Sequence, residues 1–115
     1  MRGRPLIVVA ALALVACNGA GDETVSSPAD LAADVGCLTC HTETSTTIAP
    51  TLHGIWGTDV ELVDGRVVTV DEEYVRRAIA DPTADVVAGY GPTMPRLPLD
   101  ESEVDRLVEW VRSLG

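Results

Sequence analysis

Two cysteines and a histidine stand close together in the segment GCLTCH, residues 36–41. Cys37 and Cys40 are three residues apart, about one turn of a helix, so both thiols can face the same side. Thiols at this spacing can add across the two vinyl groups of one haem, and the imidazole of His41 can then ligate the iron. The motif therefore predicts covalent attachment of a single haem c.

Three other uses of these residues remain open. A redox-active dithiol is expected beside a βαβ unit, and no such unit is visible in this chain. A zinc site usually has residues between its ligands, so His53 would have to serve and a fourth ligand is not evident. A plain disulfide between Cys37 and Cys40 suits an oxidising compartment. Haem attachment is favoured, because the chain has only two Trp, two Tyr and no Phe to fill a core.

The N-terminus predicts export. Arg2 and Arg4 precede an apolar run over residues 6–16, which suits a signal peptide and is shorter than the roughly 20 residues that a membrane-spanning helix needs. The run ends Leu-Val-Ala-Cys, which resembles a lipobox, with an ordinary signal-peptide cleavage nearby as the alternative. Residues 1–16 are thus predicted to be a lipoprotein signal peptide, and Cys17 the lipidated N-terminus.

The rest of the chain divides into a tether and one domain. Residues 17–27 are small and polar, and after lipidation they would act as a flexible tether. Residues 28–115 suffice for a single domain. We expect this domain to be exported and lipid-anchored to a membrane, facing the periplasm or the cell exterior.

The charge limits the classes of partner. The chain carries 8 basic and 18 acidic side chains, and loss of Arg2 and Arg4 with the leader leaves a formal charge of −12. Nucleic acid is therefore excluded as a partner. We expect acidic residues to meet a basic face of a protein partner, in a contact weakened by salt.

Hydrophobic spacing and end signals predict three helices and a hairpin. Residues 27–41 are expected to form one helix that carries the cysteines at its C-terminal end. Two β-branched runs around Asp64-Gly65 predict a hairpin over residues 60–70. Residues 71–81 form a helix stopped by Pro82, residues 83–99 are irregular, and a capping box opens the last helix over residues 100–114. The fold class is mostly α, with long loops and a short β-hairpin.

A family resemblance covers nearly all of residues 36–114. The chain resembles class I c-type cytochromes, and more narrowly the C-terminal cytochrome c domain fused to subunit II of bacterial haem-copper cytochrome c oxidases. It departs from that subunit in having no copper-binding cupredoxin domain and no membrane helices. The matching segments are GCLTCH, APTLHGIWG, LVDGRVVTVDEEYVRRAIADP, VVAGYGPTMP and LVEWVRSL.

The resemblance implies a role for each site residue. Cys37 and Cys40 would form the thioethers to haem, and His41 would be the proximal iron ligand. The carbonyl of Pro50 would accept the second N–H of that imidazole. Met94 would be the distal ligand, and it is also the only methionine that follows the leader.

Three further side chains are candidates for the walls of the haem pocket. Tyr90, Trp56 and Arg76 could line it or reach a haem propionate, although plain packing is the favoured role for each. The predicted function is single-electron transfer between membrane redox proteins, such as a terminal oxidase or a cytochrome-reducing complex, with no small-molecule substrate and no catalysis. The alternative is a haem enzyme or gas sensor with a displaceable distal ligand.

Overall fold

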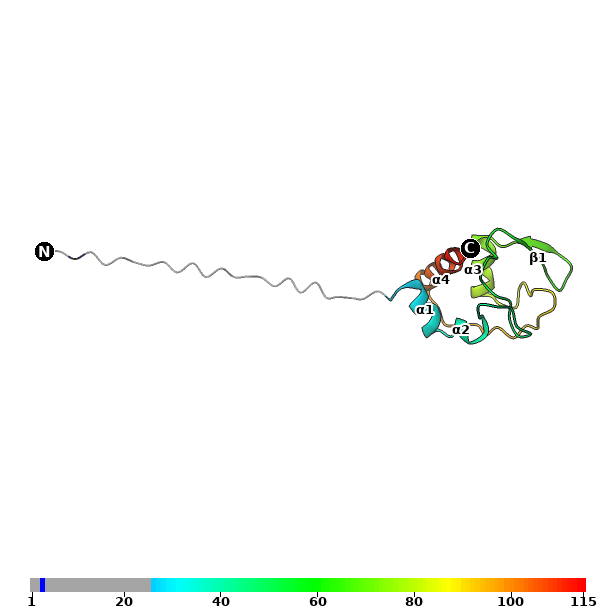
Figure 1. Cartoon of the computed structure of the whole chain (residues 1–115), viewed down its shortest axis with the longest axis horizontal. Coiled ribbons are helices and arrows are strands. Elements are labelled where there is room, and N and C mark those ends of the chain that lie inside the picture. The colour runs from blue at the N-terminus through cyan, green and yellow to red at the C-terminus, as the bar shows by residue number, and fades with distance from the viewer. Residues whose placement is uncertain (1–2, 4–25) are drawn as a thin grey trace.

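The computed structural model describes Gly3 and residues 26–115 of the 115-residue chain. Cys17, the remainder of the predicted signal peptide and the tether up to residue 25 lie outside the described residues. Four helices and one two-stranded antiparallel sheet make up the domain (Figure 1). In chain order these are α1 (Pro28–Asp34), α2 (Cys37–Cys40), β1 (Asp59–Glu61), β2 (Val67–Thr69), α3 (Glu72–Ala80) and α4 (Glu101–Ser113).

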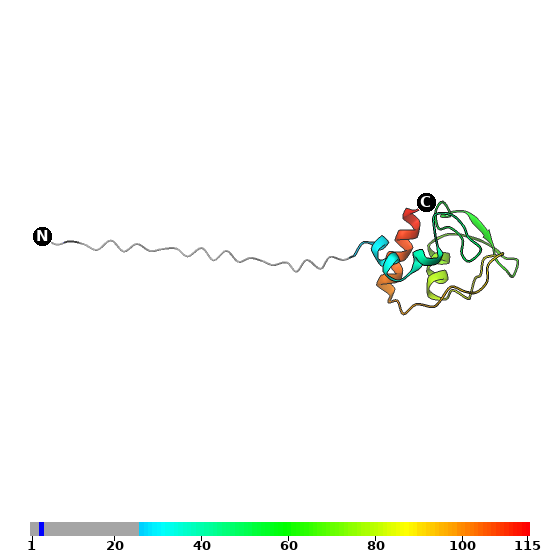
Figure 2. The ribbon, with the colours of Figure 1, turned by 60° about the horizontal axis from the view of Figure 1, so that its bottom comes forward.

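The predicted class, mostly α with long loops and a short hairpin, is confirmed. Loops join α2 to β1 and α3 to α4, and the two views of the ribbon show them curving around one side of the domain (Figure 2). None of the described helices has the length and hydrophobicity needed to span a membrane.

The prediction of one helix over residues 27–41 is wrong. Ser27 caps α1 and Pro28 begins it as expected, but the helix ends at Asp34. Gly36 has a φ of 90°, and its N–H donates to the carbonyl oxygen of Ala33 at 3.2 Å. A glycine in the left-handed region after the last helical turn is a common helix stop. The cysteines therefore lie on a separate single turn, α2.

Residues just before α1 are tied to the domain. Ser27 and Asp30 form a reciprocal capping box. The guanidinium of Arg106 on α4 donates to the backbone carbonyl of Ser26. The last two residues of the predicted tether, Ser26 and Ser27, thus belong structurally to the folded part.

The predicted hairpin is confirmed, and the Leu62 N–H, which donates to the Arg66 carbonyl at 2.8 Å, closes a three-residue loop over residues 63–65. Gly65 donates its N–H to the Leu62 carbonyl at 2.9 Å and has a φ of 86°, which is the usual arrangement of a type I turn followed by a left-handed glycine. Two further backbone bonds, Val63 N–H to the Val86 carbonyl and Ala88 N–H to the Glu61 carbonyl, join the hairpin to the segment after α3. The hairpin thereby holds that segment in place.

Both long helices begin where their capping residues predict. Asp71 accepts the N–H of Tyr74 and opens α3, and Asp100 with Glu103 forms the capping box of α4. Helix α4 packs against both α1 and α3, and this contact makes the core. The buried residues are Leu31 and Ala32 of α1, Tyr74 and Val75 of α3, Leu62 and Val70 beside the hairpin, and Val104, Leu107, Val108, Trp110 and Val111 of α4.

Candidate cofactor site

A large apolar cavity lies between the helices and the two long loops. Its volume is about 490 Å³, within the range of roughly 300–1,000 Å³ that is usual for small-molecule and cofactor sites. Residues of α2, α3 and α4 and of both long loops line it. Five of the predicted site residues are among them, namely Cys37, Cys40, His41, Pro50 and Met94.

Helix α2 brings both cysteines to this cavity. It is one turn long and is preceded by Gly36, whose left-handed backbone turns the chain between α1 and α2. Cys37 and Cys40 are half-buried free thiols. The N–H of His41 still bonds to the Cys37 carbonyl at 2.9 Å, but the backbone of His41 is extended, so the chain leaves the helix there.

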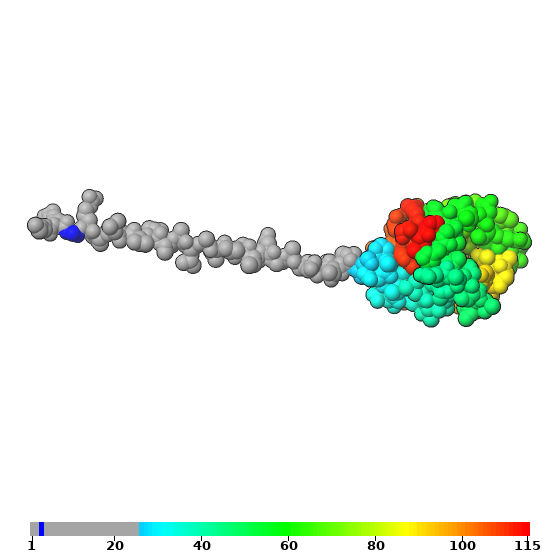
Figure 3. Space-filling model, viewed as in Figure 1, coloured from blue at the N-terminus to red at the C-terminus, as the bar shows by residue number. Residues whose placement is uncertain are grey.

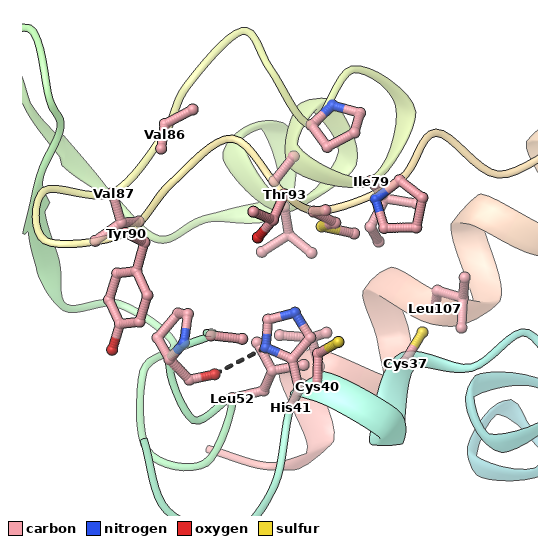
Figure 4. A pocket seen from close by; sticks show the side chains of 18 of the residues that line it. Cys37, Cys40, His41, Leu52, Ile79, Val86, Val87, Tyr90, Thr93 and Leu107 are labelled. Atoms are coloured by element: carbon pink, nitrogen blue, oxygen red, sulfur yellow. Dashed lines mark hydrogen bonds between the residues drawn. The ribbon is translucent and has the colours of Figure 1, made fainter. Parts of the chain in front are cut away.

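The imidazole of His41 is oriented by a backbone carbonyl. Its Nδ1 lies 2.8 Å from the carbonyl oxygen of Pro50 (Figure 4). Because a carbonyl oxygen can only accept, Nδ1 must carry the proton and donate it. The neutral ring then has its lone pair on Nε2, the nitrogen that remains to ligate a metal.

Polar side chains fold the loop that presents Pro50. The N–H of Thr46 donates to the Ala49 carbonyl at 3.0 Å, and the N–H of Thr51 donates to Ser45 Oγ at 2.9 Å. The hydroxyl of Thr51 donates to the Glu43 carbonyl at 3.0 Å. These bonds replace secondary structure in an irregular segment, so Pro50 is held where His41 can reach it.

The end of α4 supports the same loop from outside. The N–H groups of Gly54 and Trp56 donate to the carbonyls of Leu114 and Gly115, at 3.2 and 3.0 Å. The guanidinium of Arg112 lies over the Trp56 ring, 4.7 Å from its centroid, at a distance typical of a cation–π contact. The space-filling view shows the red end of α4 lying directly against the green loop residues (Figure 3).

The opposite wall of the cavity comes from α3 and the segment before α4. Figure 4 shows Ile79 and Thr93 across the open space from His41 and Leu52, with Val87 and Tyr90 at one end. Met94, next to Thr93 in the chain, is half-buried and also lines the cavity. The fold thus brings together a histidine on one side and a methionine-bearing segment on the other.

Several other predicted residues do not line the cavity. His53 is exposed and outside the lining. Trp56 packs under Arg112, and Arg76 pairs with Asp105 on the outer surface at 2.5 Å. Trp56 and Arg76 thus lie outside the cavity lining, in line with the favoured packing role, whereas Tyr90 does line the cavity.

An ion-pair cluster at the cavity wall was not foreseen. The carboxylate of Asp85, only 3% exposed, accepts from Arg66 Nη2 at 2.7 Å and from Arg77 Nε. The hydrogen bond from Arg77, followed by that from Arg66, holds the pKa of Asp85 below its ordinary value. Burial, together with this nearby negative charge, raises the pKa of Tyr74. No local signal could reveal the cluster, because Arg77 and Arg66 lie 8 and 19 residues from Asp85 in the chain.

Two of the alternative roles of Cys37 and Cys40, a redox-active dithiol and a zinc site, can be compared with the structure. Burial raises the pKa of the Cys37 thiol, whereas a reactive redox thiol needs a lowered one. The sheet is a two-stranded antiparallel hairpin and contains no βαβ unit. Over residues 26–115, no group of three or more His, Cys, Asp or Glu side chains is arranged to hold a metal ion.

Comparison of the chain with protein-family models and with curated proteins found no match. Any function must therefore be inferred from the cavity and the residues around it.

Proposed function

We propose that this domain is a single-haem c-type cytochrome that carries single electrons between membrane redox proteins. The observation that supports this most directly is the composition of the cavity wall. Two thiols one helical turn apart, an imidazole with its Nδ1 already hydrogen-bonded, and a thioether all line one apolar cavity. This donor set suits covalent haem c with histidine and methionine ligation.

Each of these residues has a distinct task in this proposal. Cys37 and Cys40 form thioethers that keep the cofactor attached outside the cell. His41 ligates through Nε2, and the Pro50 carbonyl fixes its tautomer and raises its basicity as a ligand. Met94 would supply the second protein ligand, and its thioether would favour the reduced iron and a high reduction potential. Haem c bound in this way supplies a one-electron couple.

The surroundings of the site suit electron transfer rather than catalysis. The cavity is lined mostly by apolar side chains, which exclude water and lower the dielectric constant around a cofactor. If His41 and Met94 both ligated the iron, no ligand position would remain for a substrate. The domain then needs only to dock, and its acidic surface favours partners with a basic face.

The proposal extends to family and location. We place the domain with class I c-type cytochromes, similar to the cytochrome domain fused to subunit II of bacterial haem-copper oxidases. A lipid on Cys17 would hold it at the membrane, facing the periplasm or the cell exterior. A terminal oxidase or a cytochrome-reducing complex is the class of partner that this arrangement suits.

Optical spectra of two variants test the proposal. The protein is made with the cellular haem-attachment machinery, and spectra are recorded oxidised, reduced, and reduced under carbon monoxide. Wild type should carry covalent haem and resist carbon monoxide. Met94→Ala should keep the haem, bind carbon monoxide and have a lower reduction potential. His53→Ala is the matched control, since His53 is exposed and outside the cavity, and it should behave as wild type.

Other outcomes would change the assignment. A colourless wild-type protein would refute the cytochrome proposal altogether. Carbon monoxide binding by wild type would favour the haem enzyme or gas sensor. If His53→Ala allowed carbon monoxide to bind the iron and Met94→Ala did not, the iron would be ligated by two histidines. The proposal of a high-potential electron carrier would then be refuted.

A further inference from the structure

The segment that bears Met94 is held to the rest of the domain by few polar contacts. We define the Met94 segment as Gly91–Leu99. Within the described residues its backbone hydrogen bonds are internal, from the Thr93 N–H to the Gly91 carbonyl and from the Leu99 N–H to the Leu97 carbonyl, both at 2.9 Å. Among residues 26–115, one polar contact joins this segment to another part of the domain, the ion pair between Arg96 Nη2 and Asp81 Oδ1 at 2.8 Å.

The composition of the Met94 segment explains this scarcity. Three of its nine residues are prolines, which have no N–H to donate. Met94, Leu97 and Leu99 are partly buried, and the other residues are exposed. Apolar contacts from these three side chains are non-directional and hold the segment near the cavity without fixing its position.

Asp81, by contrast, sits on a well-anchored part of the fold. It is the C-terminal cap of α3, and its N–H donates to the Arg77 carbonyl at 2.7 Å. Its own carbonyl accepts the N–H of Ala84 at 3.0 Å. The next residue, Pro82, is buried and lines the cavity. An ion pair to Asp81 thus links the Met94 segment to the end of a helix that forms the cavity wall.

We propose that the Arg96–Asp81 ion pair is a positioning contact that keeps the Met94 segment closed over the cavity. This inference rests on the proposed function, because it assumes that Met94 ligates the haem iron. Arg96 is two residues from Met94, so the ion pair restrains the chain immediately beside the ligand. A thioether is a weak iron ligand, and a small change in the closed population of its segment changes access to the iron.

The expected effect of breaking the Arg96–Asp81 ion pair can be derived from the solvent exposure of its two side chains. The side chains of Arg96 and Asp81 are 68% and 48% exposed, so water and salt screen their attraction. Exposed pairs of this kind change an equilibrium by about two- to five-fold. A ligand that binds only the open form has an apparent dissociation constant inversely proportional to the open fraction. Breaking the pair should therefore tighten the apparent binding of such a ligand by about two- to five-fold.

Imidazole titration of the oxidised holoprotein measures this open fraction. The titration is followed by the visible spectrum, at a pH where imidazole is mostly neutral and at low and high ionic strength. The variants are Arg96→Gln, Asp81→Asn and the charge-reversed pair Arg96→Asp/Asp81→Arg. Asp105→Asn is the matched control, because it breaks an exposed ion pair with Arg76 away from the cavity.

The proposal predicts a specific pattern. Each single variant should bind imidazole about two- to five-fold more tightly than wild type at low salt, and the reversed pair should recover part of the wild-type value. At high salt the imidazole affinity of wild type should approach that of the single variants, since screening weakens the ion pair. The control should match wild type at both ionic strengths.

Met94→Ala separates failure of this inference from failure of the proposed function. If Met94→Ala fails to tighten imidazole binding, Met94 is not the ligand and both proposals are refuted. If Met94→Ala tightens binding strongly but Arg96→Gln and Asp81→Asn match wild type, only the positioning role is refuted. Equal tightening by Asp105→Asn would also refute it, because the effect would then be a general consequence of losing a surface charge pair.

Discussion

If the domain binds haem as proposed, its stability should depend on that cofactor, and Cys37→Ser/Cys40→Ser tests this dependence. The double variant cannot form thioethers, so haem can no longer be attached covalently. The side chains that line the cavity then lose the partner that would fill the space between them. We expect a colourless chain with little stable tertiary structure.

The magnitude follows from the volume of the cavity. At about 24 cal/mol per Å³ of cavity, a space of about 490 Å³ costs about 12 kcal/mol if the walls stay in place. A domain of this length, residues 28–115, has a total unfolding free energy of about 4–13 kcal/mol. Inward movement of the two long loops lowers the cost but breaks their hydrogen bonds. Either way, little net stability is left.

Circular dichroism and urea unfolding measure the outcome. The double variant should show a reduced helical signal and no cooperative transition. Leu38→Ala is the matched control, because Leu38 lies between the two cysteines, is 49% exposed, and leaves both thiols in place. This control should remain coloured and unfold cooperatively. A double variant that is colourless, yet unfolds cooperatively with the same unfolding free energy as the control, would refute the reasoning.

Three further predictions concern single positions. Asp85→Asn should lower the unfolding free energy by about 1–2 kcal/mol at neutral pH, because both arginine partners stay partly hydrated. Since the ion pairs depress the pKa of Asp85, their contribution is complete above its ordinary value of 3.8 and is lost as the pH falls below it. The unfolding free energies of wild type and Asp85→Asn, measured with urea, should therefore converge at acidic pH. A difference that does not change with pH would contradict this. Gly36→Ala should lower the unfolding free energy, measured with urea, by about 1 kcal/mol, because the φ of 90° at this position disfavours a side chain. Gly91→Ala is the control and should leave the unfolding free energy nearly unchanged. Cys17→Ser should move the protein out of the membrane fraction, and release of the wild-type protein by salt alone would refute a lipid anchor.

Much of the local structure can be predicted from the sequence, because its signals act over a few residues. Asp71 and Asp100 mark the starts of α3 and α4, since each caps N–H groups within three residues of itself. The Asp64-Gly65 pair predicts the hairpin for the same reason. Gly36 carried an equally local signal, a glycine after a short apolar-periodic run, and it ends α1.

The chemistry of the candidate site is also visible in the sequence, but only on one side. Cys37, Cys40 and His41 lie within residues 37–41, so their spacing alone predicts that they bind one cofactor. Met94 lies more than 50 residues later, and spacing cannot place it. Its position at the same cavity depends on how the segments on either side of it pack.

Contacts between distant elements depend on the tertiary structure alone. Trp110 is only 8% exposed, because α4 is covered by both α1 and α3. Asp85 meets Arg66 only because the hairpin holds the segment after α3, and Arg96 meets Asp81 across 15 residues of chain. Helical and strand periodicities report which face of an element is buried, but not which element covers it. The sequence by itself determined the starts of α1, α3 and α4, the hairpin and the cysteine motif, whereas the cavity and the ion pairs at its edges required the packed chain.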